Sequence, residues 1–175
     1  PTIDPKDPYA LTEEEEDIME RLACAFLNCE KLQKHMRFLL NKGSLYKVYN
    51  NNLLYHGCVP LCEDGSLKTV RIYGHEYKGK SLYEVLESYV RKGFYAIDAG
   101  ERQRGRDMMW YIWLSENSPL FGKDKMATFE RYFLADKETH KEQKNPYYHL
   151  LENEEVIDGI LKEFELPEQG THIIN

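Results

Sequence analysis

The stretch LLYHGCVP, residues 53–60, places one histidine at the end of a short apolar run and a glycine directly after it. Leu53 to Tyr55 is typical of a buried strand that is bounded by turn residues. Gly57 permits a sharp backbone bend after the imidazole, and Pro60 ends any further ladder pairing. A neutral imidazole at a strand end suits a metal ligand or a proton carrier. The alternative interpretation is that His56 is hydrogen-bonded inside the fold.

Further elements are predicted on both sides of this histidine. Residues 44–49 and 53–57 form two strands joined at Asn50-Asn51-Asn52, because asparagine tolerates the positive φ angles of a hairpin turn. Another strand is predicted over residues 68–73. A helix follows over residues 81–92, with apolar side chains on one face.

The N-terminal part predicts an extended linker and one long helix. Residues 1–10 contain three prolines and form the linker, and the helix spans residues 11–42. Thr12 and Glu15 form a capping box at its start, and Gly43 ends it. Its apolar residues alternate in spacings of four and three and form one continuous stripe. This stripe suits either a helix lying on its own domain or a coiled-coil seam.

The C-terminal part is less regular. Residues 99–106 are interpreted as a flexible basic loop, either a phosphate site or a solvated connector. Residues 107–114 are expected to be buried, as strand or helix. A helix over residues 125–134 is expected to pack Phe129, Tyr132 and Phe133 into a core. A last helix spans about 154–164, and a strand begins near residue 171. Interspersed helices and strands favour an α/β or α+β fold.

Composition excludes several classes of protein. The chain has 175 residues, enough for one domain with a sizeable core, and a net charge of −7, which argues against a general nucleic-acid binder. It contains no apolar run of about 18 residues, so no membrane span is expected. The four cysteines have no CxxC spacing, which favours reduced thiols and a cytoplasmic location. Because the chain starts without methionine, we interpret it as a segment of a longer protein.

Short catalytic motifs are absent from the sequence. The six histidines form no HExxH pair, so a self-contained zinc site is not predicted. No GxxxxGK[ST], GxGxxG or GxSxG sequence is present, which gives no support to a nucleotide-binding loop or a serine hydrolase. His140 and His149 flank a polar loop that suits contact with a phosphorylated ligand.

Several stretches of the chain resemble the bacterial class 3 fructose-1,6-bisphosphatases. The resemblance runs from about Leu11 to Asn175 and is carried by Ser44-Leu45-Tyr46, residues 52–60, Phe121-Gly122-Lys123, and residues 128–133, 137–142, 144–148 and 172–175. That family is similar to the calcineurin-like metallophosphoesterases, two-metal enzymes built on a β-sandwich flanked by helices. The resemblance implies that residues 11–175 are part of such a domain.

The resemblance also implies where the metal ligands lie. The superfamily uses strand-end motifs of the form D-x-H, G-D-x-x-D-R, G-N-H-D, a histidine followed by glycine, and a final G-H. His56-Gly57 matches the fourth motif, and the family pattern continues with the last motif directly after Asn175. The first three would precede Pro1. Cys58 stands where related phosphatases carry a second glycine, a departure that the class 3 family tolerates.

The implied activity is hydrolysis of the 1-phosphate of fructose 1,6-bisphosphate, a step of gluconeogenesis, by a hydroxide held between two divalent ions. His56 would bind one ion, expected to be manganese. Arg131, Lys141 and Lys144 are candidates for the sugar phosphates, chosen for charge and neighbourhood. No proton donor is assigned, and the segment alone is expected to be inactive.

Two alternatives remain open from the residues. One is a non-catalytic helical interaction or homo-oligomerisation module that uses the helix over residues 11–42. The other is a metallophosphatase of different specificity, since only the family wording distinguishes a sugar bisphosphate from protein or nucleotide substrates.

Overall fold

A computed structural model describes Lys6, Asp7 and residues 9–175. The predicted linker over residues 1–10 therefore falls largely outside the described residues. The chain divides into two compact units, residues 1–43 and residues 44–175. Within the part of the chain that the structure describes, no helix combines the length and the hydropathy that crossing a bilayer requires.

The first unit contains two helices, α1 (Glu13–Leu27) and α2 (Glu30–Lys42), so the prediction of one continuous helix over residues 11–42 is wrong. The Asn28 side chain donates to the carbonyl of Cys24 at 2.9 Å, and Cys29 adopts an extended conformation with ψ of 99°. Asparagine competes for helical carbonyls in this way, which ends α1 although the apolar spacing continues.

Both predicted ends of this helical segment are confirmed. The amide of Glu15 donates to Thr12 Oγ1, and the amide of Thr12 donates to Glu15 Oε2 at 2.8 Å, which completes the capping box. Gly43 follows the last residue of α2, and its amide donates to the carbonyl of Leu39 at 2.7 Å.

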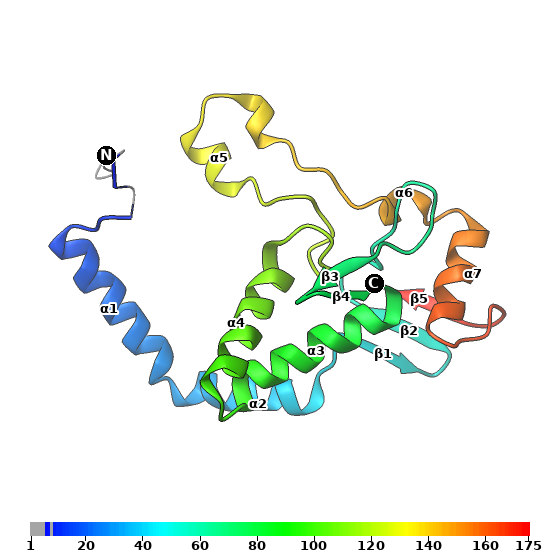
Figure 1. Cartoon of the computed structure of the whole chain (residues 1–175), viewed down its shortest axis with the longest axis horizontal. Coiled ribbons are helices and arrows are strands. Elements are labelled where there is room, and N and C mark those ends of the chain that lie inside the picture. The colour runs from blue at the N-terminus through cyan, green and yellow to red at the C-terminus, as the bar shows by residue number, and fades with distance from the viewer. Residues whose placement is uncertain (1–5, 8) are drawn as a thin grey trace. The chain divides into compact units, whose positions relative to one another are not determined.

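The second unit is built around a three-stranded sheet in the order β1-β2-β5 (Figure 1). β1 (Tyr46–Tyr49) and β2 (Asn52–Tyr55) pair antiparallel, whereas β5 (His172–Ile174) pairs parallel to β2. Asn50 and Asn51 have φ angles of 55° and 57°, so the predicted hairpin turn is confirmed. The predicted terminal strand is also present as β5.

A second sheet of two antiparallel strands, β3 (Val70–Ile72) and β4 (His75–Tyr77), completes the β structure of the described residues. The mixed α/β character is therefore confirmed. Two small separate sheets do not by themselves form a β-sandwich, and the calcineurin-like sandwich stays a prediction.

Two helices cross closely in this unit, α3 (Gly79–Tyr95) and α4 (Ala99–Leu114). The predicted loop over residues 99–106 is wrong, because these residues form the first half of α4. Asp98 caps this helix by accepting from the amide of Glu101 at 2.8 Å. The expected burial of residues 107–114 is also wrong for three apolar side chains, since Met109, Trp110 and Trp113 are 39%, 59% and 63% exposed.

Residues 125–143 leave the body of the second unit as an excursion that carries α5 (Thr128–Phe133) and the 3-10 helix η1 (Lys137–His140). Its base is closed by hydrogen bonds between Asp124 and Gln143, in which each backbone amide donates to an oxygen of the other residue. The prediction that the aromatic residues of this helix fill a core is wrong, because all three are mostly exposed: Phe129, Tyr132 and Phe133. Only six residues are helical here, too few to lay a continuous apolar face on the domain.

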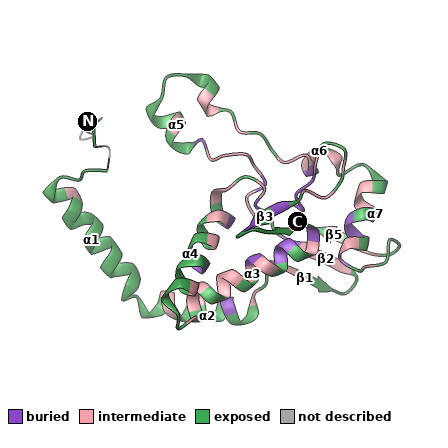
Figure 2. Ribbon diagram, in the orientation of Figure 1, coloured by how far each residue is buried: buried purple, intermediate pink, exposed green. Residues whose placement is uncertain are grey.

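After the excursion come α6 (Tyr147–Leu150) and α7 (Glu154–Glu163), and α7 confirms the predicted last helix. The buried residues gather on α3, α7 and the adjoining strands (Figure 2). They form two clusters, and α3 contributes to both. Tyr83 packs with β2 and α7 in the first cluster, whereas Leu82 and Leu86 pack with β3 and α4 in the second.

Two glycine substitutions are expected to have opposite effects on stability. A Cβ at Gly105 of α4 would overlap the backbone of Gly93 in α3, so Gly105→Ala should lower the free energy of unfolding by about 1–3 kcal/mol. A Cβ at Gly159 in the middle of α7 meets no atom within 4 Å, so Gly159→Ala should raise it by roughly 0.5–1 kcal/mol. Urea denaturation of both variants measures the two changes, and equal changes would contradict the tight α3–α4 crossing.

Candidate functional site

His56 follows β2 directly and is exposed, as expected for a side chain at a strand end. Within the described residues its ring has no hydrogen-bond or ion-pair partner, so the alternative of a histidine bonded inside the fold is not supported. The ring borders two open hollows. One, of about 400 Å³, lies against the end of β5, and the other, of about 480 Å³, is lined by Trp113, Phe121 and Lys123.

The turn after His56 is fixed by close backbone contacts. Gly57 has a φ of 92°, and a Cβ there would collide with the carbonyl oxygens of Pro119 and Leu120. The amide of Cys58 donates to the carbonyl of Pro119 at 2.7 Å. Only glycine fits this combination of dihedral angle and close approach, which explains the residue that follows the histidine.

The end of β5 lies beside the same turn. The parallel register pairs Leu54 with Ile174, so Asn175 is level with the last residue of β2. Its side-chain amide donates to the carbonyl of Gly57 at 2.9 Å. The ends of β2 and β5 therefore lie at the same edge of the sheet.

Three buried tyrosines form hydrogen bonds beside this edge of the sheet. The hydroxyls of Tyr55 and Tyr147 are 2.7 Å apart, and the Tyr83 hydroxyl donates to the carbonyl of Cys58 at 2.9 Å. Burial raises the pKa of each of these phenols above its ordinary value. They are therefore neutral at physiological pH and act as hydrogen-bonding groups in the core.

The cysteines do not add metal ligands at this turn. Burial raises the pKa of Cys58 to about 12, so its thiol stays protonated at neutral pH and is a poor ligand. Among the described residues, no group of three or more His, Cys, Asp or Glu side chains is placed to hold a metal ion. His56 fits one ligand of a shared centre, exposed and free of competing bonds, and cannot hold an ion alone.

Lys123 is a charged residue near the histidine that sequence reasoning missed. It lines the same hollow as His56, and its ammonium forms an ion pair with Glu142 at 2.7 Å. Lys123 also lines a third hollow, of about 270 Å³, which holds both lysines and carboxylates: Lys68, Lys144, Glu63, Glu116 and Asp124. The only signal in the sequence is its position in the stretch Phe121-Gly122-Lys123, since a lone lysine after a turn is otherwise ordinary.

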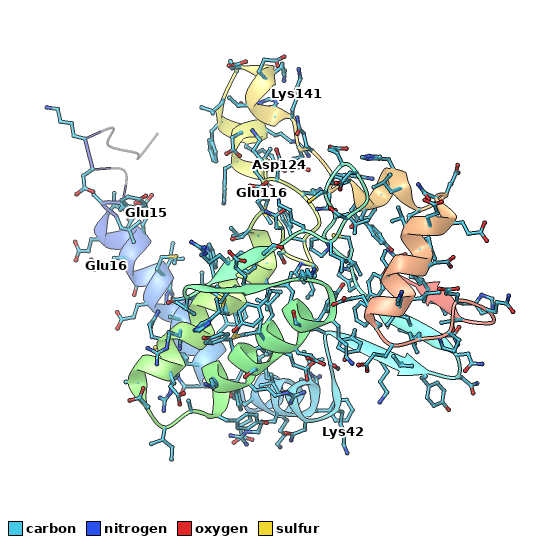
Figure 3. The ribbon with its side chains drawn as sticks, turned by 45° about the vertical axis from the view of Figure 1, so that its right-hand side comes forward. Glu15, Glu16, Lys42, Glu116, Asp124 and Lys141 are labelled. Carbon is cyan, nitrogen blue, oxygen red and sulfur yellow. The ribbon has the colours of Figure 1, made fainter. Side chains whose placement is uncertain are left out.

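The three predicted phosphate-binding residues do not gather at one point. Lys144 lies over the Tyr148 ring, 5.5 Å from its centroid, and reaches the hollow that Lys123 shares. Arg131 is linked to Lys123 only through Glu142, whose carboxylate lies 3.4 Å from the Arg131 guanidinium. Lys141 pairs with Glu138 at 2.6 Å, and Figure 3 shows it toward the far end of the excursion, whereas Asp124 lies nearer its base. Lys144 is therefore the best placed of the three.

The sequence of the chain is similar to sequences of known proteins. The sequence model of the Firmicute fructose-1,6-bisphosphatases matches residues 1–175. The chain belongs to this family. No solved structure matches it.

The relatives carry the name fructose-1,6-bisphosphatase class 3. The chain is 54% identical to that of Clostridium tetani, 53% to that of Clostridium novyi and 55% to that of Clostridioides difficile. Each similarity covers 100% of this chain and 26–27% of the relative. The chain thus spans about a quarter of the length of the relatives it matches.

Glu142 is expected to stabilise the base of the excursion in a pH-dependent manner. It accepts from Lys123 and from the amide of Ala127, and the Lys123 ammonium is the main cause that holds the pKa of Glu142 below its ordinary value. Its contribution is therefore present at neutral pH and is lost as the pH falls through the lowered pKa. Glu142→Gln should cost about 1 kcal/mol at pH 7, since solvent screens the pair.

Urea denaturation from neutral to acid pH measures this contribution. The difference between the wild type and Glu142→Gln should narrow toward zero in acid. Glu138→Gln, which removes only the exposed partner of Lys141, serves as the control and should change little at any pH. A difference between the wild type and Glu142→Gln that persists unchanged in acid would contradict the role of the charge.

Proposed function

We propose that the protein containing this chain is a class 3 fructose-1,6-bisphosphatase. It would hydrolyse the 1-phosphate of fructose 1,6-bisphosphate to give fructose 6-phosphate and phosphate, as a cytoplasmic enzyme of gluconeogenesis. The observation that carries the proposal is the identity of 53–55% across the whole chain to relatives of that name. Self-association as a homo-oligomer stays a prediction.

His56 is proposed as a ligand of one divalent ion, expected to be manganese. Its position after β2, its exposure and the absence of a competing partner among the described residues support this role. When bound, a pair of divalent ions supplies Lewis acidity toward a phosphoryl oxygen and lowers the pKa of water. The imidazole contributes a neutral nitrogen donor from a rigid strand end, where its backbone needs no rearrangement to present it.

The remaining ligands are proposed to come from parts of the protein outside these residues. One of them would follow Asn175, as the family resemblance implies, and this proposal is supported by the parallel pairing that ends β5 and β2 at one edge of the sheet. A single imidazole leaves most coordination positions of an ion unfilled, so the isolated chain is expected to be inactive.

The phosphate groups of the substrate are proposed to meet the lysines beside the histidine. Lys144 has no carboxylate partner among the described residues, so its ammonium is available to an anion. Lys123 lines both the hollow that His56 borders and the hollow that Lys144 lines. It therefore lies between the proposed metal ligand and Lys144. Arg131 and Lys141 stay proposals for the same role, and each would first have to exchange its carboxylate partner for a phosphate.

Replacing the histidine tests the proposed metal role. In the full-length protein, His56→Ala should lower manganese content and cut phosphate release from fructose 1,6-bisphosphate by at least about 100-fold, because even indirect supports of a ligand are worth 10–100-fold. Elemental analysis and a phosphate assay measure the two effects. His75→Ala, on the exposed strand β4, is the matched control and should retain both. A fully metallated and active His56→Ala protein would refute the assignment.

Replacing the lysine tests the proposed substrate contact. In the full-length protein, Lys144→Ala should raise KM for fructose 1,6-bisphosphate by about 10-fold, equivalent to about 1.4 kcal/mol, with kcat little changed. Steady-state kinetics at saturating manganese separates the two constants. Lys162→Ala, an exposed change on α7, should leave both unaltered. An unchanged KM for Lys144→Ala would remove this residue from the substrate site.

A further inference from the structure

One peptide plane directly after His56 is held from both sides. The Gly57 carbonyl and the Cys58 amide belong to the same peptide group. The carbonyl accepts from the side chain of Asn175 at 2.9 Å, and the amide donates to the carbonyl of Pro119 at 2.7 Å. Two hydrogen bonds in opposite directions fix the rotation of this plane, since a peptide group turns as a rigid unit.

The residue before the histidine is held by a second hydrogen bond. The Tyr55 hydroxyl contacts the hydroxyl of Tyr147, which is only 1% exposed. His56 therefore lies between two residues that are each held, Tyr55 through its hydroxyl and Gly57 through its carbonyl. We call these two hydrogen bonds, made by Tyr147 and Asn175, the brace.

His56 itself makes no such bond. Within the described residues its ring has no polar partner, so the backbone on either side sets the direction in which its Cα–Cβ bond points. Asn175 suits the brace because its side-chain amide nitrogen is a donor, which the Gly57 carbonyl requires. An aspartate of the same shape would place a carboxylate against the Gly57 carbonyl and would repel it.

We propose that Asn175 and Tyr147 are positioning residues that fix the direction in which His56 leaves the sheet toward its metal ion. The inference rests on the proposed function of His56 as a ligand and adds a role for two residues that do not themselves touch the ion. Outer groups that orient a ligand typically contribute 10–100-fold to metal affinity or activity. The brace also joins strand ends that lie 118 residues apart in the sequence, so it forms only when β5 is in register.

The test measures manganese affinity in the full-length protein. Asn175→Ala should weaken manganese binding by 10–100-fold, and Tyr147→Phe should weaken it by several-fold, since the ring remains and only the hydroxyl is lost. Electron paramagnetic resonance of free manganese during titration gives the Kd without reference to turnover. Saturating manganese should restore kcat, with KM for the sugar bisphosphate unchanged. Because Tyr147 and Asn175 hold the residues on either side of the same histidine, the double variant should lose less than the product of the single losses.

Matched controls separate positioning from loss of stability. Asn52→Ala removes an asparagine whose side chain bonds only within its own turn, to the carbonyls of Tyr49 and Asn50, and Tyr46→Phe removes a hydroxyl bonded to Glu84. Both should keep the manganese Kd of the wild type, even where the unfolding temperature falls. A Kd within twofold of the wild type for Asn175→Ala and Tyr147→Phe would overturn the brace.

His56→Ala, titrated in parallel, distinguishes the two levels of the argument. Weakened binding in His56→Ala together with normal binding in Asn175→Ala overturns the brace and leaves the proposed ligand in place. Normal binding in His56→Ala overturns the ligand assignment and the brace with it. Weakened binding in both, with the two controls unchanged, supports both.

Discussion

The parallel pairing of β2 with β5 is the constraint on which the candidate site depends. It aligns Leu54 with Ile174 and so brings Asn175 within 2.9 Å of the Gly57 carbonyl. The antiparallel hairpin of β1 and β2 is local and forms from its own turn, whereas the β2–β5 pair closes a loop of more than a hundred residues. The edge of the sheet that presents His56 is therefore completed by β5, which lies near the end of the chain. This edge forms only when the residues between β2 and β5 have brought the two strands together.

Helix α3 is connected to this strand end in two ways. The first is direct, because the buried Tyr83 hydroxyl donates to the carbonyl of Cys58 at 2.9 Å. The second passes through α4, which crosses α3 at Gly105. The buried Ser118 donates to the carbonyl of Ile112 at 2.6 Å, and its oxygen accepts from the amide of Leu120. This turn presents the carbonyl of Pro119 to the Cys58 amide, so α4 is connected to the site through the Ser118 hydroxyl and the backbone of this turn.

Local signals in the sequence were sufficient where neighbouring residues decide the structure. The Asn50-Asn51 turn, the capping box at Thr12 and the strand before His56 each depend on residues within a few positions. The break at Asn28 and the start of α4 at Asp98 were missed, because single side-chain caps outweigh the spacing of apolar residues. Of the residues at the candidate site, the sequence predicts His56 and Lys144. Lys123 and Asn175 reach it through tertiary contacts, and neither residue differs locally from an ordinary surface residue.

The candidate site has two parts that are held in different ways, one by the buried core and one by exposed ion pairs. His56 stands on a strand end whose backbone is held by buried tyrosines and by tight contacts with Pro119. The lysines lie where the excursion over residues 125–143 leaves the domain, and there one carboxylate, Glu142, joins Lys123 and Arg131 to the amide of Ala127. A metal ligand needs a fixed direction, whereas groups that meet a flexible sugar phosphate tolerate small movements. The proposed roles match that difference in physical demand, since the proposed metal ligand His56 follows β2 and the proposed phosphate contacts Lys123 and Lys144 lie at the base of the excursion.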